Sequence, residues 1–68
     1  MNKLLALSVI IDDRAGDDKY AQAYVMADSI IAMHEDLDDE NCCYILLSSG
    51  HDMHVNLSLN DLKGMLNP

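Results

Sequence analysis

The sequence predicts an α+β fold in the order β-α-β-β-α, in which a three-stranded sheet packs against one long amphipathic helix and a short C-terminal helix closes the chain. Three observations support this fold class. Residues 4–11 are almost entirely apolar, residues 19–35 repeat apolar positions with a helical period, and residues 53–59 alternate between apolar and polar. With 68 residues the chain suffices for one small domain, which we expect to span residues 1–68.

Residues 4–11 have the length and the β-branched finish of a strand. Leu5 and Leu7 fall on one face of this strand, and Leu4 and Ile10 fall on the other. Because both faces are largely apolar, we expect an interior strand or one whose second face meets another molecule.

Residues 19–35 predict an amphipathic helix of about four to five turns. When the residues are placed at intervals of about 100°, apolar side chains such as Met26 and Ile30 gather within half of the circumference. Polar side chains such as Gln22 and Asp28 fall on the opposite half. If the flanking strands are parallel neighbours, this helix forms a right-handed crossover between them.

A β-hairpin follows, with strands at residues 43–48 and 53–59 joined by the turn SSGHD. Its register stays open, because a loop of odd length places Leu47 opposite Val55 and a loop of even length places Leu46 there.

The last residues predict a short closing helix. Ser58 or Asn60 can cap its N-terminus, and Leu62, Met65 and Leu66 supply an apolar face. With one long and one short helix, part of one sheet face stays open, and an open apolar face favours self-association.

The charge of the chain is strongly negative. Twelve acidic residues against four basic ones give a formal net charge of −8. Phosphate backbones and anionic lipids repel such a chain, so we expect no direct nucleic-acid binding and no membrane binding. A strongly negative surface can instead attract a protein partner with a basic surface, or it can simply keep a small protein in solution.

Negative charge is concentrated at two places that flank the predicted helix. Five carboxylates fall within residues 35–40, where each opposes the helix dipole by about 0.3–1 kcal/mol and all repel one another. Four aspartates precede the helix, where capping and the dipole favour them. The candidate partner-binding residues are Glu35, Asp36, Asp38, Asp39 and Glu40, followed by Asp12, Asp13, Asp17 and Asp18.

These patterns predict a small, cytoplasmic, non-enzymatic interaction protein that regulates or inhibits a partner through its negative surface. The two acidic groups would mark the ends of a negative ridge along the helix, and duplex DNA likewise carries closely spaced negative charge along a rod. We therefore expect a nucleic-acid-handling partner. In size and acidity the chain is similar to accessory proteins of phages and mobile elements, including nucleic-acid mimics that inhibit host defence, although no motif identifies a family.

A second hypothesis is a self-associating structural module. The outer face of the predicted sheet is apolar, and two copies that cover it would form a homodimer. The residues that we expect in this interface are Leu4, Ala6, Ile10, Tyr44 and Leu46.

A third hypothesis is weak metal binding, because the chain holds three histidines and two cysteines. The predicted hairpin places Cys42 and His51 at opposite ends, and His34 falls on the apolar face of the predicted helix, where a core histidine is expected. His51 and His54 alone would make a weak surface site. We therefore assign no structural metal and no cofactor from the sequence.

Neither catalysis nor secretion is indicated by the sequence. Nucleophilic catalysis needs a cysteine or serine close to a base, and no histidine is expected opposite Cys42 or Cys43. Adjacent cysteines on a strand point to opposite faces, so we expect one buried thiol, one exposed and redox-sensitive thiol, and no internal disulfide. The initial apolar run is followed by Asp12 and Asp13 rather than by a cleavage site, which favours a cytoplasmic protein.

Overall fold

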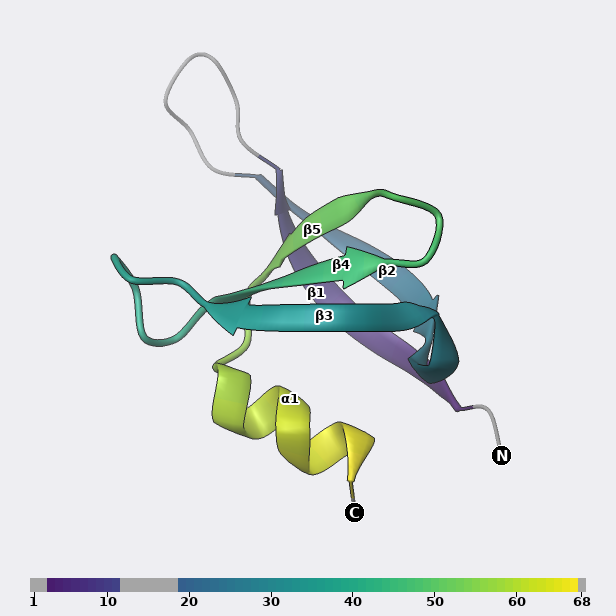
Figure 1. The fold of residues 1–68 in the computed structure, drawn as a ribbon. Helices are drawn as coiled ribbons and strands as arrows, with labels where there is room; N and C mark the ends of the chain where they lie inside the picture. The colour runs from purple at the N-terminus through teal and green to yellow at the C-terminus, as the bar shows by residue number, and fades with distance from the viewer. Residues whose placement is uncertain (1–2, 12–18, 68) are drawn as a thin grey trace.

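Five antiparallel strands and one short α-helix make up the described part of the chain (Figure 1). The computed structural model describes residues 3–11 and 19–67. In chain order the elements are β1 (Leu4–Ile11), β2 (Lys19–Met26), the 3-10 helix η1 (Ala27–Ser29), β3 (Ile30–Glu35), β4 (Cys43–Leu47), β5 (Asp52–Val55) and α1 (Leu59–Leu66). The strands lie in the order β2-β1-β5-β4-β3, so β2 and β3 are the two edges of the sheet.

The predicted fold class is wrong, because the long amphipathic helix does not form. Residues 19–35 instead build β2, η1 and β3, so the sheet has five strands rather than the three of the predicted β-α-β-β-α order. β2 alternates like a strand, with Tyr20 and Tyr24 on one face and Ala23 and Val25 on the other. Both faces of this strand carry apolar or aromatic side chains. Plotted at helical intervals, these side chains gather on half of the circumference, so the strand imitates an amphipathic helix.

Pairing with β1 explains why these residues form strands. All eight residues of β2 pair with β1 in one continuous antiparallel register. Tyrosine and valine favour strands, and this pairing satisfies the backbone groups along one edge of β1. The other edge of β1 meets β5, again antiparallel, through the pair Val9 and Val55. The arrangement of parallel neighbouring strands joined by a helical crossover is therefore not found.

The other strand predictions are largely confirmed. β1 has the predicted bounds, and β4 and β5 form the predicted antiparallel hairpin. The register has the parity of an odd-length loop, but the hairpin is tighter than expected, since Ile45 faces Met53 and β5 ends at Val55. Gly50 permits this turn with a φ of 94°, in the left-handed region that glycine adopts without strain.

The core lies between one face of the sheet, here called the inner face, and α1, which packs below the sheet in Figure 1. Leu5 and Leu7 from β1, Ile45 from β4 and Val55 from β5 are buried in one cluster with Leu62 of α1. With a single apolar face, α1 therefore covers the inner-face side chains of β1, β4 and β5.

The predicted closing helix is confirmed, and hydrogen bonds hold both of its ends. Ser58 Oγ accepts the backbone N–H of Asp61 at 3.1 Å, which satisfies one of the free donors of the first turn. At the other end, Lys3 Nζ donates to the carbonyl oxygen of Met65 at 3.0 Å, where the helix dipole favours a cation.

The opposite face of the sheet, here called the outer face, is left uncovered by α1. On the β1–β2 hairpin this face carries Leu4 and Tyr24, which are 58% and 67% exposed. Within the described residues, no helix is long and apolar enough to cross a membrane.

Candidate functional site

The acidic run begins at Glu35, the last residue of β3, and continues through a hairpin loop rather than ending a helix. Residues 36–42, here called the acidic loop, connect β3 to the antiparallel β4. Without the predicted helix there is no helix dipole for the carboxylates to oppose, so that argument for a functional role is wrong, and the negative ridge along the helix does not exist. The fold instead brings the acidic loop next to β5 and to the start of α1.

Two of the five carboxylates stabilise the acidic loop itself. Asp36 Oδ1 accepts the backbone N–H of Asp38 at 2.9 Å, and Asp39 Oδ1 accepts that of Asn41, also at 2.9 Å. Aspartate favours such turns because its short side chain reaches the backbone two residues on. The second oxygen of each carboxylate, Oδ2, is directed to neighbouring side chains.

Three chemically different side chains meet at the base of the acidic loop, and we call them the Asp–Cys–His cluster. They are Asp36 after β3, Cys42 before β4 and His54 on β5. The Nε2–H of His54 donates to Asp36 Oδ2 at 2.8 Å, and the Cys42 thiol donates to Asp39 Oδ2 at 3.5 Å. One potential ligand atom from each member of the cluster lies within 4.8 Å of the other two.

The surroundings shift the acidity of two members of this cluster. The backbone N–H of Asp38 holds the pKa of Asp36 below its usual value; desolvation opposes this shift, and the hydrogen bond from His54 adds to it. Burial, together with the hydrogen bond and the charge of Asp39, raises the pKa of the Cys42 thiol to about 11. The Cys42 thiol is therefore protonated near neutral pH.

Both cysteines are free and buried, so the prediction that one of them is exposed is wrong. Cys43 lies in the core on the inner face, and burial raises the pKa of its thiol. Cys42 lies on the side of the sheet that carries His54, where Asp39 of the acidic loop and Asn56 after β5 contact its sulfur at 3.5 and 3.9 Å.

Beside the cluster, three stacked rings cross the outer face. The ring of Tyr44 lies between those of His34 and His54, with centroid separations of 5.1 and 4.3 Å. Stacking on Tyr44 restrains the His54 ring next to Asp36. His34 is exposed on the edge strand β3, so the prediction of a core histidine on a helix is wrong.

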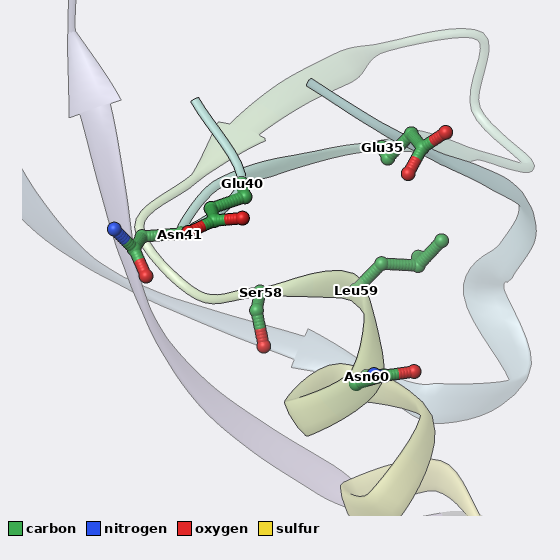
Figure 2. A pocket seen from close by; sticks show the side chains of 6 residues that line it. All are labelled: Glu35, Glu40, Asn41, Ser58, Leu59 and Asn60. Carbon is green, nitrogen blue, oxygen red and sulfur yellow. The ribbon is translucent and has the colours of Figure 1, made fainter. Parts of the chain in front are cut away.

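A polar pocket of about 300 Å³ opens between the acidic loop and the start of α1 (Figure 2). It is lined by Glu35, Glu40, Asn41, Ser58, Leu59 and Asn60. The Leu59 side chain extends toward Glu35, so an apolar surface lies next to a carboxylate. In the described part of the chain, no cationic side chain pairs with Glu35 or Glu40.

The predicted partner-binding residues fall into three groups. Glu35 and Glu40 line the pocket, and Asp38 is exposed in the acidic loop. Asp36 and Asp39 are engaged within the loop and at the cluster. The remaining candidates, Asp12, Asp13, Asp17 and Asp18, lie outside the described residues.

The residues predicted for self-association are all on the outer face. They are Leu4, Ala6 and Ile10 on β1, and Tyr44 and Leu46 on β4. Tyr44 is half-buried between the two imidazole rings, whereas Leu4 is exposed and has the exposed Tyr20 and Tyr24 on the neighbouring strand. The exposed apolar surface is therefore concentrated on the β1–β2 hairpin.

Sequence reasoning missed the approach of Cys42 to His54 and the contribution of Ser58 and Asn60 to the pocket. Strand parity places Cys42 and His54 on one face, and the pairing of Tyr44 with His54 brings them close. That pairing follows from the tight turn between Leu47 and His51, which the turn sequence SSGHD did not distinguish from a longer one.

No protein-family model matches the chain, and no curated protein or solved structure matches it either. The described residues form a small antiparallel β-sheet protein with two polar sites at one end of the sheet, the pocket beside the acidic loop and the Asp–Cys–His cluster.

Proposed function

We propose that this chain is a small acidic interaction protein that acts without catalysis and regulates or inhibits a basic, nucleic-acid-handling protein, as phage and mobile-element anti-defence proteins do. The observation that carries the proposal is the pair of carboxylates, Glu35 and Glu40, that line the pocket without a cationic partner among the described residues. Asp38 adds an exposed carboxylate in the same loop. The formal net charge of −8 favours attraction to a basic surface.

The pocket suits the end of an arginine or lysine side chain from the partner. The carboxylates and the amide oxygens of Asn41 and Asn60 are acceptors, and a guanidinium group presents five donors. Leu59 offers an apolar surface to the methylene stem of such a side chain. A volume of about 300 Å³ accommodates one such group.

The thiol and hydroxyl chemistry supports a non-enzymatic role. The thiolate is the reactive form of cysteine, and burial raises the pKa of Cys42 to about 11. Ser49 Oγ lies 3.0 Å from His51 Nδ1 in the β4–β5 turn, but among residues 3–11 and 19–67 no third group orients His51.

We also propose a cytoplasmic location. Cys42 and Cys43 are free and buried next to each other, and a reducing compartment keeps such thiols unpaired. Fractionation of the cells that make the protein tests this, and recovery from an oxidising compartment would contradict it.

Neutralising the pocket tests the main proposal. We expect the double variant Glu35→Gln and Glu40→Gln to bind a fluorescent arginine-rich peptide more than about tenfold more weakly, because a hydrogen bond to a charged group contributes about 1.5–3 kcal/mol. The matched control, Asp52→Asn with Asp61→Asn, removes the same charge elsewhere and should retain most of the affinity. Equal losses in both variants would reduce the interaction to nonspecific charge attraction and overturn the proposal.

The identity of the partner can be approached by capture from the native lysate at low and high salt. Exposed charges are screened beyond about 10 Å at 0.1 M salt, so we expect capture of a basic nucleic-acid-binding protein that is lost as salt rises. Conversion of the second candidate group, Asp12, Asp13, Asp17 and Asp18, to asparagine tests whether it contributes. Capture that is insensitive to salt would contradict an electrostatic interface.

A second candidate function is self-association, with a second copy of the chain on the outer face of the β1–β2 hairpin. Leu4, Tyr20, Tyr24 and Met26 are all exposed on this face, and Leu4 lies opposite Met26. Contiguous apolar surface of this kind favours association. Measurement of the molecular mass in solution at two protein concentrations tests the idea, and a monomer at both would exclude it.

A further inference from the structure

We propose that Asp36, Asp39, Cys42 and His54 form a binding site for one zinc ion. The site lies at the base of the acidic loop, where residues from the loop meet β5. It shares no residue with the pocket beside α1, so the proposal is independent of the partner binding proposed above.

The combination of donor atoms points to zinc among common biological cations. A thiol sulfur, an imidazole nitrogen and a carboxylate oxygen of Asp36 lie within 4.8 Å of one another, and Asp39 Oδ2 lies 3.5 Å from that sulfur. Zinc accepts sulfur, nitrogen and oxygen ligands, usually four in a tetrahedron, whereas calcium and magnesium take oxygen ligands. Cys42 therefore argues against the oxygen-binding cations and for a borderline-soft one.

Two separations within the proposed site are close to those between ligands of a tetrahedral ion. With metal–ligand distances of about 2.0 Å to oxygen and nitrogen and about 2.3 Å to sulfur, tetrahedral ligands lie about 3.5 Å apart for sulfur and oxygen and about 3.3 Å apart for nitrogen and oxygen. Cys42 Sγ and Asp39 Oδ2 are 3.5 Å apart, and His54 Nε2 and Asp36 Oδ2 are 2.8 Å apart. A widening of a few tenths of an ångström at the second pair is therefore sufficient there.

Neighbouring groups already orient the ligand atoms. In both aspartates Oδ1 accepts a backbone N–H, which leaves Oδ2 free to turn to the cluster. The His54 ring is stacked on Tyr44 at a centroid separation of 4.3 Å and an interplanar angle of 7°. Contacts of this kind around metal ligands typically improve affinity because they fix the ligand orientation before the ion binds.

Zinc binding in this site is a ligand exchange. The hydrated ion loses water, the Cys42 thiol gives its proton to solvent, and the resulting thiolate bonds to zinc. The neutral His54 ring changes tautomer, because Nε2 gives its proton to solvent and Nδ1 takes one up, so the net proton released comes from Cys42. No oxidant or reductant is needed.

The first experiment uses cobalt as a spectroscopic substitute for zinc. The full chain, reduced and treated with a chelator, is titrated with Co²⁺ and then with Zn²⁺. We expect one ion per chain, a thiolate-to-cobalt charge-transfer band, the strong visible absorption of tetrahedral cobalt, and displacement by Zn²⁺. Cys42→Ser should abolish the charge-transfer band, while Cys43→Ala, which removes the neighbouring thiol, should keep it. Absence of the band in the wild-type protein, or its survival in Cys42→Ser, overturns the proposal.

A second pair of variants avoids the core and keeps the loop geometry. Asp39→Asn retains an oxygen that can accept the N–H of Asn41 but loses the anionic ligand, so we expect zinc affinity to fall at least about tenfold. Asp38→Asn removes the same charge from an exposed side chain of the same loop and should change the affinity by less than about threefold. Equal effects of the two substitutions would show that the loop attracts cations only through its net charge.

Discussion

The β1–β2 hairpin and the β3–β4–β5 half of the same sheet are held in different ways. The hairpin has an unbroken ladder of eight paired residues, yet its outer face carries exposed side chains such as Leu4 and Tyr24. The other half has shorter strands, but its outer face is fixed by the ring stack, the Asp36–His54 contact and the acidic loop. Side-chain interactions thus add to backbone pairing where the strands are short, and both candidate polar sites lie in that half.

The two halves meet at few points. The strands β1 and β5 pair at Val9 and Val55, and the N–H of Asn56 donates to the carbonyl oxygen of Ser8 at 2.8 Å. Buried residues from both halves share one core cluster with Leu62. Because the backbone joint is short, the common core is the main connection between them.

The largest expected effect comes from the residue that the halves share. Leu62→Ala should destabilise the protein by about 2–5 kcal/mol, because it removes a fully buried side chain and leaves a cavity. In a protein of this size such a loss is a large part of the total stability. Urea unfolding followed by circular dichroism measures it, and a loss below about 1 kcal/mol would mean that α1 is not the common support.

One tyrosine on the outer face of each half allows the two faces to be compared. Tyr44→Ala should cost about 1–3 kcal/mol, because two ring contacts of about 0.5–1.5 kcal/mol each are lost. Tyr24→Ala, at an exposed position of β2, should change the free energy of unfolding by less than about 1 kcal/mol. Denaturant melts of the two variants give the comparison, and equal losses would show that the ring stack adds no stability.

A smaller effect is expected at the helix cap. Ser58→Ala should destabilise the protein by about 1 kcal/mol, because the N–H of Asp61 loses its acceptor. Thermal melts measure the loss, and Ser58→Asp serves as the control because aspartate also caps helices. Equal stability of the alanine and aspartate variants would contradict a capping role.

The smallest expected effect is a contribution of Asp36 to stability that disappears in acid. The pKa of Asp36 is lowered in the folded protein, so its carboxylate contributes stability above its ordinary pKa of 3.8, and this contribution is lost as the pH falls through the folded value. The stability difference between the wild type and Asp36→Asn should therefore shrink below about pH 4. Urea melts at several pH values measure this difference, and a difference that stays constant through the acid range would contradict the prediction.

Much of the local structure follows from local signals. The bounds of β1, the β4–β5 hairpin and the Ser58 cap depend on alternation, turn residues and capping, which short windows of sequence contain. The helix prediction for residues 19–35 was wrong because their pattern fits both a helical and a strand period. Pairing of β2 with β1, which a short window of sequence does not contain, selects the strand.

The candidate sites were predictable only in part. A charge count locates the acidic loop and therefore Glu35, Asp38 and Glu40. It does not reveal that Asp36 and Asp39 turn inward, because this depends on backbone donors within the loop. Nor does it place His54 beside Cys42, since that contact depends on a hairpin register which a shift of two residues would destroy.

The two adjacent cysteines have a consequence for how this sequence can diverge. Cys43 and Ile45 belong to the core, while Cys42 and Tyr44 belong to the outer polar cluster. Deletion of one residue within β4 would exchange these two environments at once, placing a phenol ring in the apolar interior. Natural variants should therefore gain or lose residues in the acidic loop or the SSGHD turn, and keep the same side chains of β4 on the inner face.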